Sequence, residues 1–159
     1  MAAVVANIAK GRVNEFFNRV KNNDPTNAAI VIVVLGATGI DSLATLQDFD
    51  DLAAVLAANN EVNNTGYARK VLVDADLAAL APDDSGNFLA VDIADQTWSA
   101  VAADGTQGNW AVLALCYDSD TTAGTDANII PLCFYDFPVV PDGNDIVAVI
   151  NAAGVFKAS

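Results

Sequence analysis

Apolar residues recur every three to four positions in two segments near the start of the chain, which is the spacing of an amphipathic helix. In the second segment, residues 48–59, Asp48 is placed to cap the helix, and Leu52 and Leu56 fall on its apolar stripe. The first segment ends at the polar run 22–25, which contains a proline. Its apolar stripe consists of Val13, Phe16, Phe17 and Val20. We therefore expect two short helices in the N-terminal half.

The segment between these helices, residues 28–35, is apolar at every position and rich in β-branched residues, which predicts a strand buried on both faces. After residue 60 the pattern changes to short apolar runs separated by clusters of Pro, Gly, Asn and Asp. These runs predict further strands at residues 67–73, 88–93, 97–102, 110–117, 129–137 and 145–150. Short strands at this spacing are typical of an antiparallel sandwich or barrel.

The pattern as a whole predicts a mainly-β fold, an antiparallel β-sandwich or barrel with two short helices, and an α+β fold is the alternative. Neither an internal repeat nor a linker interrupts the sequence, so residues 1–159 are expected to form one domain, helix-containing over 1–60 and strand-rich over 61–159. Strict alternation would place Trp110 and Leu113 on opposite faces of their strand. The large aromatic side chains expected in the core are Trp98, Trp110, Tyr117 and Phe134.

The composition excludes intrinsic disorder, because 53% of the 159 residues are hydrophobic and only 17% are charged. A small domain of this kind hides its apolar surface in an alanine-rich core or against other subunits. The longest apolar run, residues 28–35, is far below the roughly 20 residues that span a bilayer, so no membrane partner is expected. The N-terminus has no positive charge ahead of its short apolar stretch, unlike a secretory signal, so we expect folding in the cytoplasm of the producing cell.

The charge of the chain is distributed unevenly around a net value of −13. Residues 71–156 contain thirteen aspartates and no Lys, Arg, His or Glu, and such a region repels nucleic acid. Arg69 and Lys70 are adjacent in a predicted strand and point to opposite faces, so one can pair with an aspartate of a neighbouring strand while the other reaches a partner, or both are ordinary surface charges. Four of the seven cations form the candidate partner contact near the N-terminus: Lys10, Arg12, Arg19 and Lys21.

The sequence contains no catalytic constellation, and we predict a protein that is not an enzyme. It has no histidine, the side chain most often used for proton transfer at neutral pH, and none of its serines lies in a nucleophile elbow. The segment VIVVLGATGIDS resembles a dinucleotide fingerprint, but Ser42 stands where the third glycine would be and no βαβ repeat follows. A plain glycine-containing turn fits residues 36–39 better, and no cofactor is expected.

An acidic loop is the nearest approach to a metal site in the sequence. Its weak candidate ligands are Asp118, Asp120 and Asp126. Counted from the first of them, Gly124 is seventh and Ile129 twelfth, whereas an EF-hand loop requires glycine at position six and glutamate at twelve. We therefore predict no metal and a solvated hairpin loop. Cys116 and Cys133 flank this loop and match no zinc pattern, which indicates two buried thiols, with a pair facing each other across the hairpin as the alternative.

Six segments spread over residues 49–157 are similar, in the same order, to segments of one known family. They are DFDDLAAVLAA, NNTGYARKVL, DQTWSA, LCYDSDTTAGTDANIIPL, YDFPVVPDGNDIVAVI and NAAGVFKA. The family that they resemble comprises small structural proteins of tailed bacteriophages, minor capsid or capsid decoration (cement) proteins encoded near the major capsid gene. None of the shared motifs is catalytic, and the N-terminal third resembles the family less closely.

This resemblance implies a non-catalytic virion protein, a decoration or cement protein that binds the outside of a phage head and stabilises it. The implied partner is the major capsid protein, with self-association on the virion after assembly in the bacterial host cytoplasm. A strongly acidic outer layer agrees with this role, because it keeps particles apart and away from nucleic acid. A neck or tail component is the alternative in the same class, and a cation- or ligand-binding β module is the alternative from another class.

Overall fold

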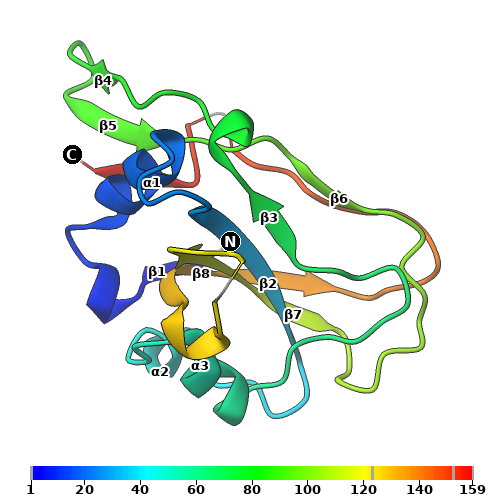
Figure 1. Ribbon diagram of the computed structural model, residues 1–159. Helices are drawn as coiled ribbons and strands as arrows, with labels where there is room; N and C mark the ends of the chain where they lie inside the picture. Colours follow the sequence, from blue (N-terminus) through cyan, green and yellow to red (C-terminus); the bar gives the residue numbers. More distant parts are fainter. Residues whose placement is uncertain (1, 123, 152, 159) are drawn as a thin grey trace.

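The central strand of the fold is β2, Ala29–Gly36, and all eight of its residues are buried. It pairs with β7, Trp110–Asp118, and with β3, Lys70–Leu72. Together with β8, Ile130–Val139, and β1, Ala3–Val5, they form a five-stranded antiparallel sheet of order β1-β8-β7-β2-β3 (Figure 1). The computed structural model describes residues 2–122, 124–151 and 153–158. Because both faces of β2 and β7 are covered, their sequences are apolar at consecutive positions.

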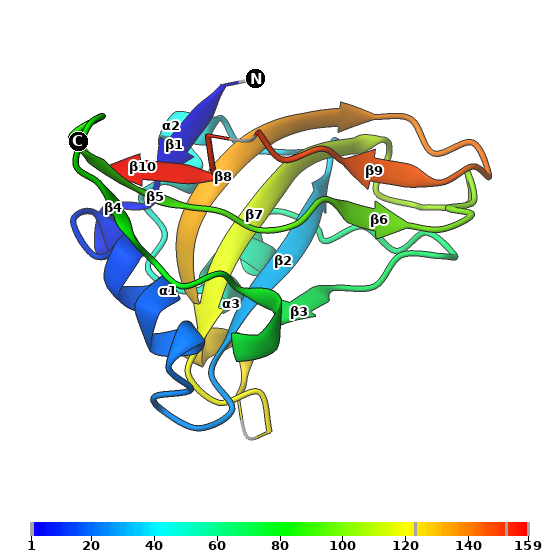
Figure 2. The same cartoon turned by 90° about the horizontal axis from the view of Figure 1, so that it is seen from above.

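Two smaller antiparallel sheets cover one face of the five-stranded sheet. One has the order β10-β5-β4 and consists of Phe156–Ala158, Phe88–Val91 and Pro82–Asp83. The other pairs β6, Gln96–Trp98, with β9, Ile146–Ala148. Figure 2 shows these strands crossing in front of the curved five-stranded sheet. The result is a layered β fold in which the last strands of the chain run beside β8.

Short helices complete both faces of the large sheet. The first, α1, Val13–Lys21, lies on the same side as β5, and its Phe16 ring is 4.7 Å from the ring of Tyr117. The next two, α2, Leu43–Leu46, and α3, Leu52–Ala58, lie on the opposite side (Figures 1 and 2). Three short 3-10 helices, η1, η2 and η3, cover Asn7–Ala9, Asp74–Asp76 and Asp126–Asn128.

The predicted fold class is confirmed. Strands account for 33% of the chain and helices for 19%, and every strand pairing is antiparallel, so the fold is mainly β rather than α+β. The predicted apolar stripe of α1 is also confirmed, because all four of its members are buried. Among the described residues, no helix is long and apolar enough to cross a membrane.

The second predicted helix is correct in place but not in its start. We expected residues 48–59 with Asp48 as the cap, whereas α3 begins at Leu52 and its cap is Asp51, whose carboxylate accepts the Ala54 N–H at 2.7 Å. Asp48 accepts a hydrogen bond from the Asn7 side chain instead. Both aspartates suit a cap by residue type, and the packing of the preceding turn decides between them.

Several strands are shorter than predicted, and others were not predicted. The run 97–102 contributes only to β6, which ends at Trp98, because Ala100 has a positive φ of 50° that interrupts the extended backbone. The run 67–73 is reduced to β3, Lys70–Leu72. The strands β1, β4 and β10 were not predicted, since two or three residues give no readable alternation.

The expected aromatic core is confirmed, with at most 3% exposure for its members Trp98, Trp110, Tyr117 and Phe134. The predicted alternation fails at the start of β7. The pairing register shifts between Trp110 and Val112 on the β8 side, and the Trp110 ring packs edge-on against Trp98 at 5.3 Å and beside Phe137 at 6.2 Å. Phe137 lines the same cavity as Leu113, so the Trp110 ring lies on the same side of the sheet as Leu113. Strict alternation would place these two side chains on opposite sides, and the register shift accounts for the difference.

Candidate functional site

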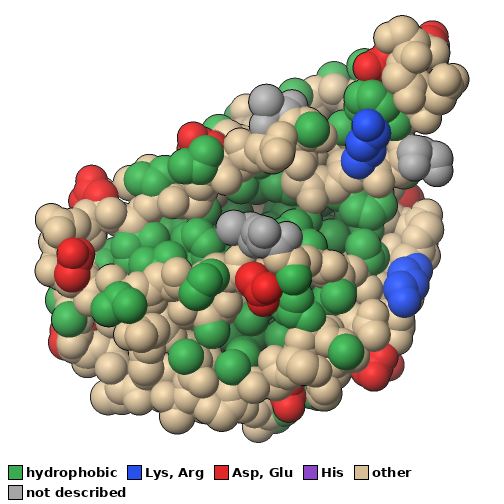
Figure 3. Space-filling view, turned by 180° about the vertical axis from the view of Figure 1, so that it is seen from behind, with side chains coloured by type: hydrophobic (Ala, Val, Ile, Leu, Met, Phe, Trp, Pro, Cys, Tyr) green, Lys and Arg blue, Asp and Glu red, His purple; other side chains and the backbone are tan. Residues whose placement is uncertain are grey.

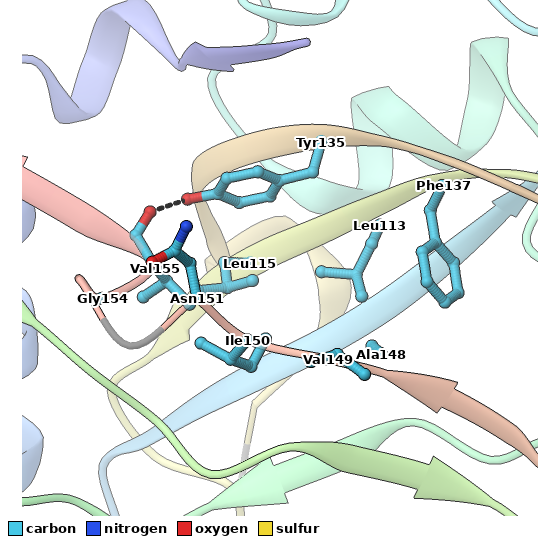
Figure 4. Close-up of a pocket in the computed structure, with 10 residues that line it drawn as sticks. All are labelled: Leu113, Leu115, Tyr135, Phe137, Ala148, Val149, Ile150, Asn151, Gly154 and Val155. Carbon is cyan, nitrogen blue, oxygen red and sulfur yellow. Dashed lines mark hydrogen bonds between the residues drawn. The ribbon is translucent and has the colours of Figure 1, made fainter. Parts of the chain in front are cut away.

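An apolar groove opens between the large sheet and the C-terminal part of the chain (Figure 4). Its volume is about 390 Å³, within the usual range for ligand pockets. The floor comes from β7 and β8, and the wall comes from β9 and the segment that follows it. The lining residues are Leu113, Leu115, Tyr135, Phe137, Ala148, Val149, Ile150, Asn151, Gly154 and Val155. Figure 3 shows hydrophobic side chains gathered in a hollow on this side of the molecule.

The lining of the groove is suited to apolar contacts. Leu115 and Phe137 are 1% and 6% exposed, so the floor is part of the core. The Tyr135 hydroxyl donates a hydrogen bond to the carbonyl of Val155 and ties the C-terminal segment to β8. Burial raises the pKa of this hydroxyl, so it stays protonated and remains a donor at neutral pH. Asn151 is the other polar side chain of the lining, and the groove is therefore suited to apolar groups rather than to acid–base chemistry.

The rim of the groove exposes further apolar side chains. Val149 lines the groove and is 73% exposed, and Val147, which lies beside the lining residue Ala148 on β9, is 45% exposed. Apolar surface gathered in one place indicates a covered surface more strongly than scattered residues do. Our sequence reasoning missed this site. The available indication was the predicted strand 145–150, which is apolar at every position from Ile146 onward. In the structure this strand has only one strand neighbour among the described residues.

The predicted partner-contact cations lie along α1 and the turn before it. Glu15 lies between two of them, 3.1 Å from the Arg12 guanidinium and 3.2 Å from that of Arg19, and all three side chains are about half exposed. The hydrogen bond from Arg12 lowers the pKa of Glu15, so this carboxylate stays charged. Lys10 donates to the side chain of Asn7, and Lys21 donates to a backbone carbonyl of η2. The four cations therefore lie on α1 and the turn that leads into it, and Glu15 pairs with the two arginines among them.

The three weak metal candidates do not form a site. Asp118 is buried and accepts the Asp120 N–H, while Asp120 accepts both the N–H and the hydroxyl of Thr122. Asp126 is held by the guanidinium of Arg69 at 2.6 Å. Within the described residues, no group of three or more His, Cys, Asp or Glu side chains is placed to hold a metal ion. The predicted hairpin loop 118–128 includes residue 123, which lies outside the described residues.

Arg69 is the centre of a charged network that links distant segments. Its guanidinium donates to Glu61 at 2.7 Å and to Asp126 at 2.6 Å, and the Tyr67 hydroxyl donates to Glu61 at 2.8 Å. The hydrogen bond from Arg69 lowers the pKa of Asp126. Pairing of a cation at 69–70 with an aspartate is thus confirmed, although the aspartate belongs to η3 and not to a neighbouring strand. The network fastens η3 and the segment that follows α3 to the residues just before β3.

Lys70 points away from this network, as expected for the neighbouring strand position. Its ammonium donates to the Thr97 carbonyl at 2.6 Å and lies 5.2 Å from the centre of the Trp98 ring. These contacts connect β3 to β6 within the chain. Lys70 therefore serves as an internal link between two sheets, and we assign it no partner.

The cysteines and the glycine turn have structural roles. Cys116 and Cys133 are both buried free thiols, as predicted, and β7 pairs Cys116 with Pro131 rather than with the other cysteine. A Cβ at Gly36 would lie 2.4 Å from the carbonyl oxygen of Gln107, so this glycine permits close passage of two backbones. Ser42 caps α2 by accepting the N–H of the third residue of that helix.

The two arrangements left for function are the apolar groove and the cations of α1. Comparison of the chain with protein-family models, curated proteins and solved structures finds no match. The function is therefore inferred from these two surfaces and from the sequence resemblance, and both surfaces are suited to contact with another molecule.

Proposed function

We propose that this chain is a non-catalytic virion protein of a tailed bacteriophage, a decoration or cement protein that binds the outside of the head. Its partner is the major capsid protein, and its copies are held on the shell by buried contact area. The resemblance of residues 49–157 to phage minor capsid and decoration proteins supports this role. The strongly acidic body also supports it, because like charge keeps assembled particles from associating.

The observation that carries the proposal is the basic helix on an acidic protein. Arg12, which directly precedes α1, and Arg19 within it are about half exposed, whereas residues 71–156 contain no cation. The buried side of the same helix holds it against the protein through Phe16 and Phe17. The cations are therefore fixed in position, and a rigid basic surface favours a partner with an acidic surface.

The experiment measures binding of the purified chain to heads of the phage that encodes it. The variant Arg12→Gln/Arg19→Gln removes two positive charges from α1 and its N-cap, and Lys157→Glu makes the same change in net charge far along the chain. We expect the first variant to bind the heads several-fold more weakly, with a smaller dependence on salt, and the second to bind like the parent. Equal occupancy by all three proteins would refute the role of α1. Absence of the parent chain from purified virions would refute the virion role itself.

Copy number distinguishes the decoration role from the neck or tail alternative. A decoration protein follows the symmetry of the whole shell and is present in hundreds of copies, whereas a neck ring has about a dozen. Quantitative mass spectrometry of purified virions against the major capsid protein gives this ratio directly. The presence of a major capsid gene beside the gene for this chain would support either placement.

The groove favours a second candidate from another class, a β module that binds a small apolar ligand. A pocket of about 390 Å³ with an apolar lining is the specific observation behind it. Titration with an uncharged long-chain alcohol, followed by calorimetry, tests this candidate. Saturable binding of one molecule per chain would favour it over the virion role.

A further inference from the structure

We propose that β9 and the apolar groove beside it receive an extended strand from a partner protein, which adds to the edge of β9. The strand has apolar side chains at alternate positions and is basic at its ends. This inference deepens the proposed function, because it names the element of the partner that the chain would bind. It rests on a strand edge, on the groove and on the charge of the surrounding surface.

The first argument is the unpaired edge. Within the described residues β9 has one neighbour, β6, and its other edge faces the groove (Figures 2 and 4). Across the groove, β1 pairs with β8 as far as Tyr135, and the Asp136 N–H donates to the carbonyl of Ala2. The last residues of β8 thus lie beyond the reach of β1. An exposed strand edge is a template for pairing with another chain.

The second argument is that the groove can take alternate side chains. Ile146 and Ala148 of β9 are buried, while Val147 and Val149 are exposed, so β9 has an inner and an outer apolar face. A strand added to its edge continues this alternation, with one set of side chains pointing down to the floor formed by β7 and β8. Its other set would lie beside Val147 and Val149 and cover them. The valines exposed on the rim would then become part of a packed surface.

The third argument is charge, which selects the partner. All lining residues of the groove lie in the part of the chain that has thirteen aspartates and no cation, and Asp95 accepts the Ile150 N–H beside the groove. A strand with basic ends complements this surface. A fatty acid would bring a carboxylate, which the aspartates of this region repel. A second copy of the chain would bring another net charge of −13 against the same face.

The probe is a synthetic peptide of alternating valine and threonine, about seven residues long, with a lysine at each end. In one control peptide the ends are glutamates, and in the other every backbone amide is N-methylated. We expect the lysine peptide to bind and to protect amides of β9 from hydrogen exchange, as followed by NMR. The glutamate peptide should bind at least several-fold more weakly. The fully N-methylated peptide should lose most of the affinity, because it keeps the side chains but has no backbone N–H to donate to the edge of β9.

A matched pair of exposed valines tests the site on the protein. Val149 lies on the groove wall and is 73% exposed, and Val71 is 49% exposed on β3, an edge strand away from the groove. Val149→Asp should weaken binding of the lysine peptide by about tenfold or more, since burial of one valine contributes about that factor. Val71→Asp should leave binding unchanged. Both substitutions are at exposed positions, so thermal unfolding should show that both variants fold.

Four results with the isolated chain would overturn the inference. They are equal binding of the N-methylated peptide, equal effects of the two valine substitutions, saturation of the groove by a long-chain alcohol without peptide binding, and self-association of the chain that Val149→Asp abolishes. The particle assay separates this inference from the proposed function. Heads that bind Val149→Asp like the parent chain refute the strand while leaving the virion role intact. Heads that never bind the parent chain refute the virion role, and the peptide result then stands by itself.

Discussion

Replacement of Trp110 by alanine is the sharpest test of how the two β layers are held together. The ring is 1% exposed and lies within 5.3 to 6.2 Å of the rings of Trp98, Tyr67 and Phe137. Its indole N–H donates to the side-chain oxygen of Asn64 at 2.9 Å, and that asparagine is itself buried. The substitution therefore removes a large buried ring and one buried hydrogen bond at the same time.

The expected magnitude follows from these two losses. Truncation of a buried tryptophan to alanine costs about 3–5 kcal/mol through lost burial and the remaining cavity. An acceptor left buried without its donor adds about 1–3 kcal/mol. Because a domain of this size has a total stability of about 5–15 kcal/mol, Trp110→Ala should bring the protein close to unfolding. Trp110→Phe keeps most of the ring and removes the donor, so about 2–3 kcal/mol is expected for it.

Urea denaturation followed by far-UV circular dichroism measures both losses, since that method does not depend on the tryptophan removed. Val71→Ala is the control, because this side chain is about half exposed and its truncation should change the free energy of unfolding by less than about 0.5 kcal/mol. A loss below about 1 kcal/mol for Trp110→Ala would refute the reasoning, and the ring would then not belong to the core of the monomer. Parent-like stability of Trp110→Phe would show that the bond to Asn64 has no net value.

Three further predictions concern charge, capping and thiols. Arg69→Met should cost about 1–3 kcal/mol at neutral pH in urea denaturation. The pKa of Asp126 is lowered in the folded state, so its pairing with Arg69 stabilises the protein fully above the unfolded pKa of about 3.9. This stabilisation is lost as the pH falls through the folded pKa. The difference in unfolding free energy between the parent and Arg69→Met should therefore shrink in acid. Asp51→Ala should cost about 1 kcal/mol in the same assay, because it removes the cap of α3. Burial raises the pKa of Cys133 to about 11 and also raises that of Cys116, so a thiol reagent at neutral pH should label neither until the protein is denatured.

The sequence by itself determined the fold class and its principal elements. The apolar run 28–35 and the strand 110–117 are found almost unchanged as β2 and β7, and the stripe of α1 is buried as its spacing required. These features are local, since a residue's neighbours three or four positions away decide which face of a helix is apolar. A strand that is apolar at every position is likewise a local signal, because successive side chains point to opposite faces and both faces must then be buried. The aromatic core followed from the size of its side chains.

Tertiary structure alone decided which distant residues meet. Arg69 and Asp126 are 57 positions apart, and nothing in either neighbourhood selects that partner from eighteen aspartates. The pairing separates Asp126 from Asp118 and Asp120, with which the sequence grouped it. The groove likewise depends on how β8 and the C-terminal segment approach each other, and the hydroxyl of Tyr135 fixes that approach. Alternation along a strand determines the face on which a side chain lies. Which segment packs against that face depends on loop closure and on packing, and these are properties of the whole chain.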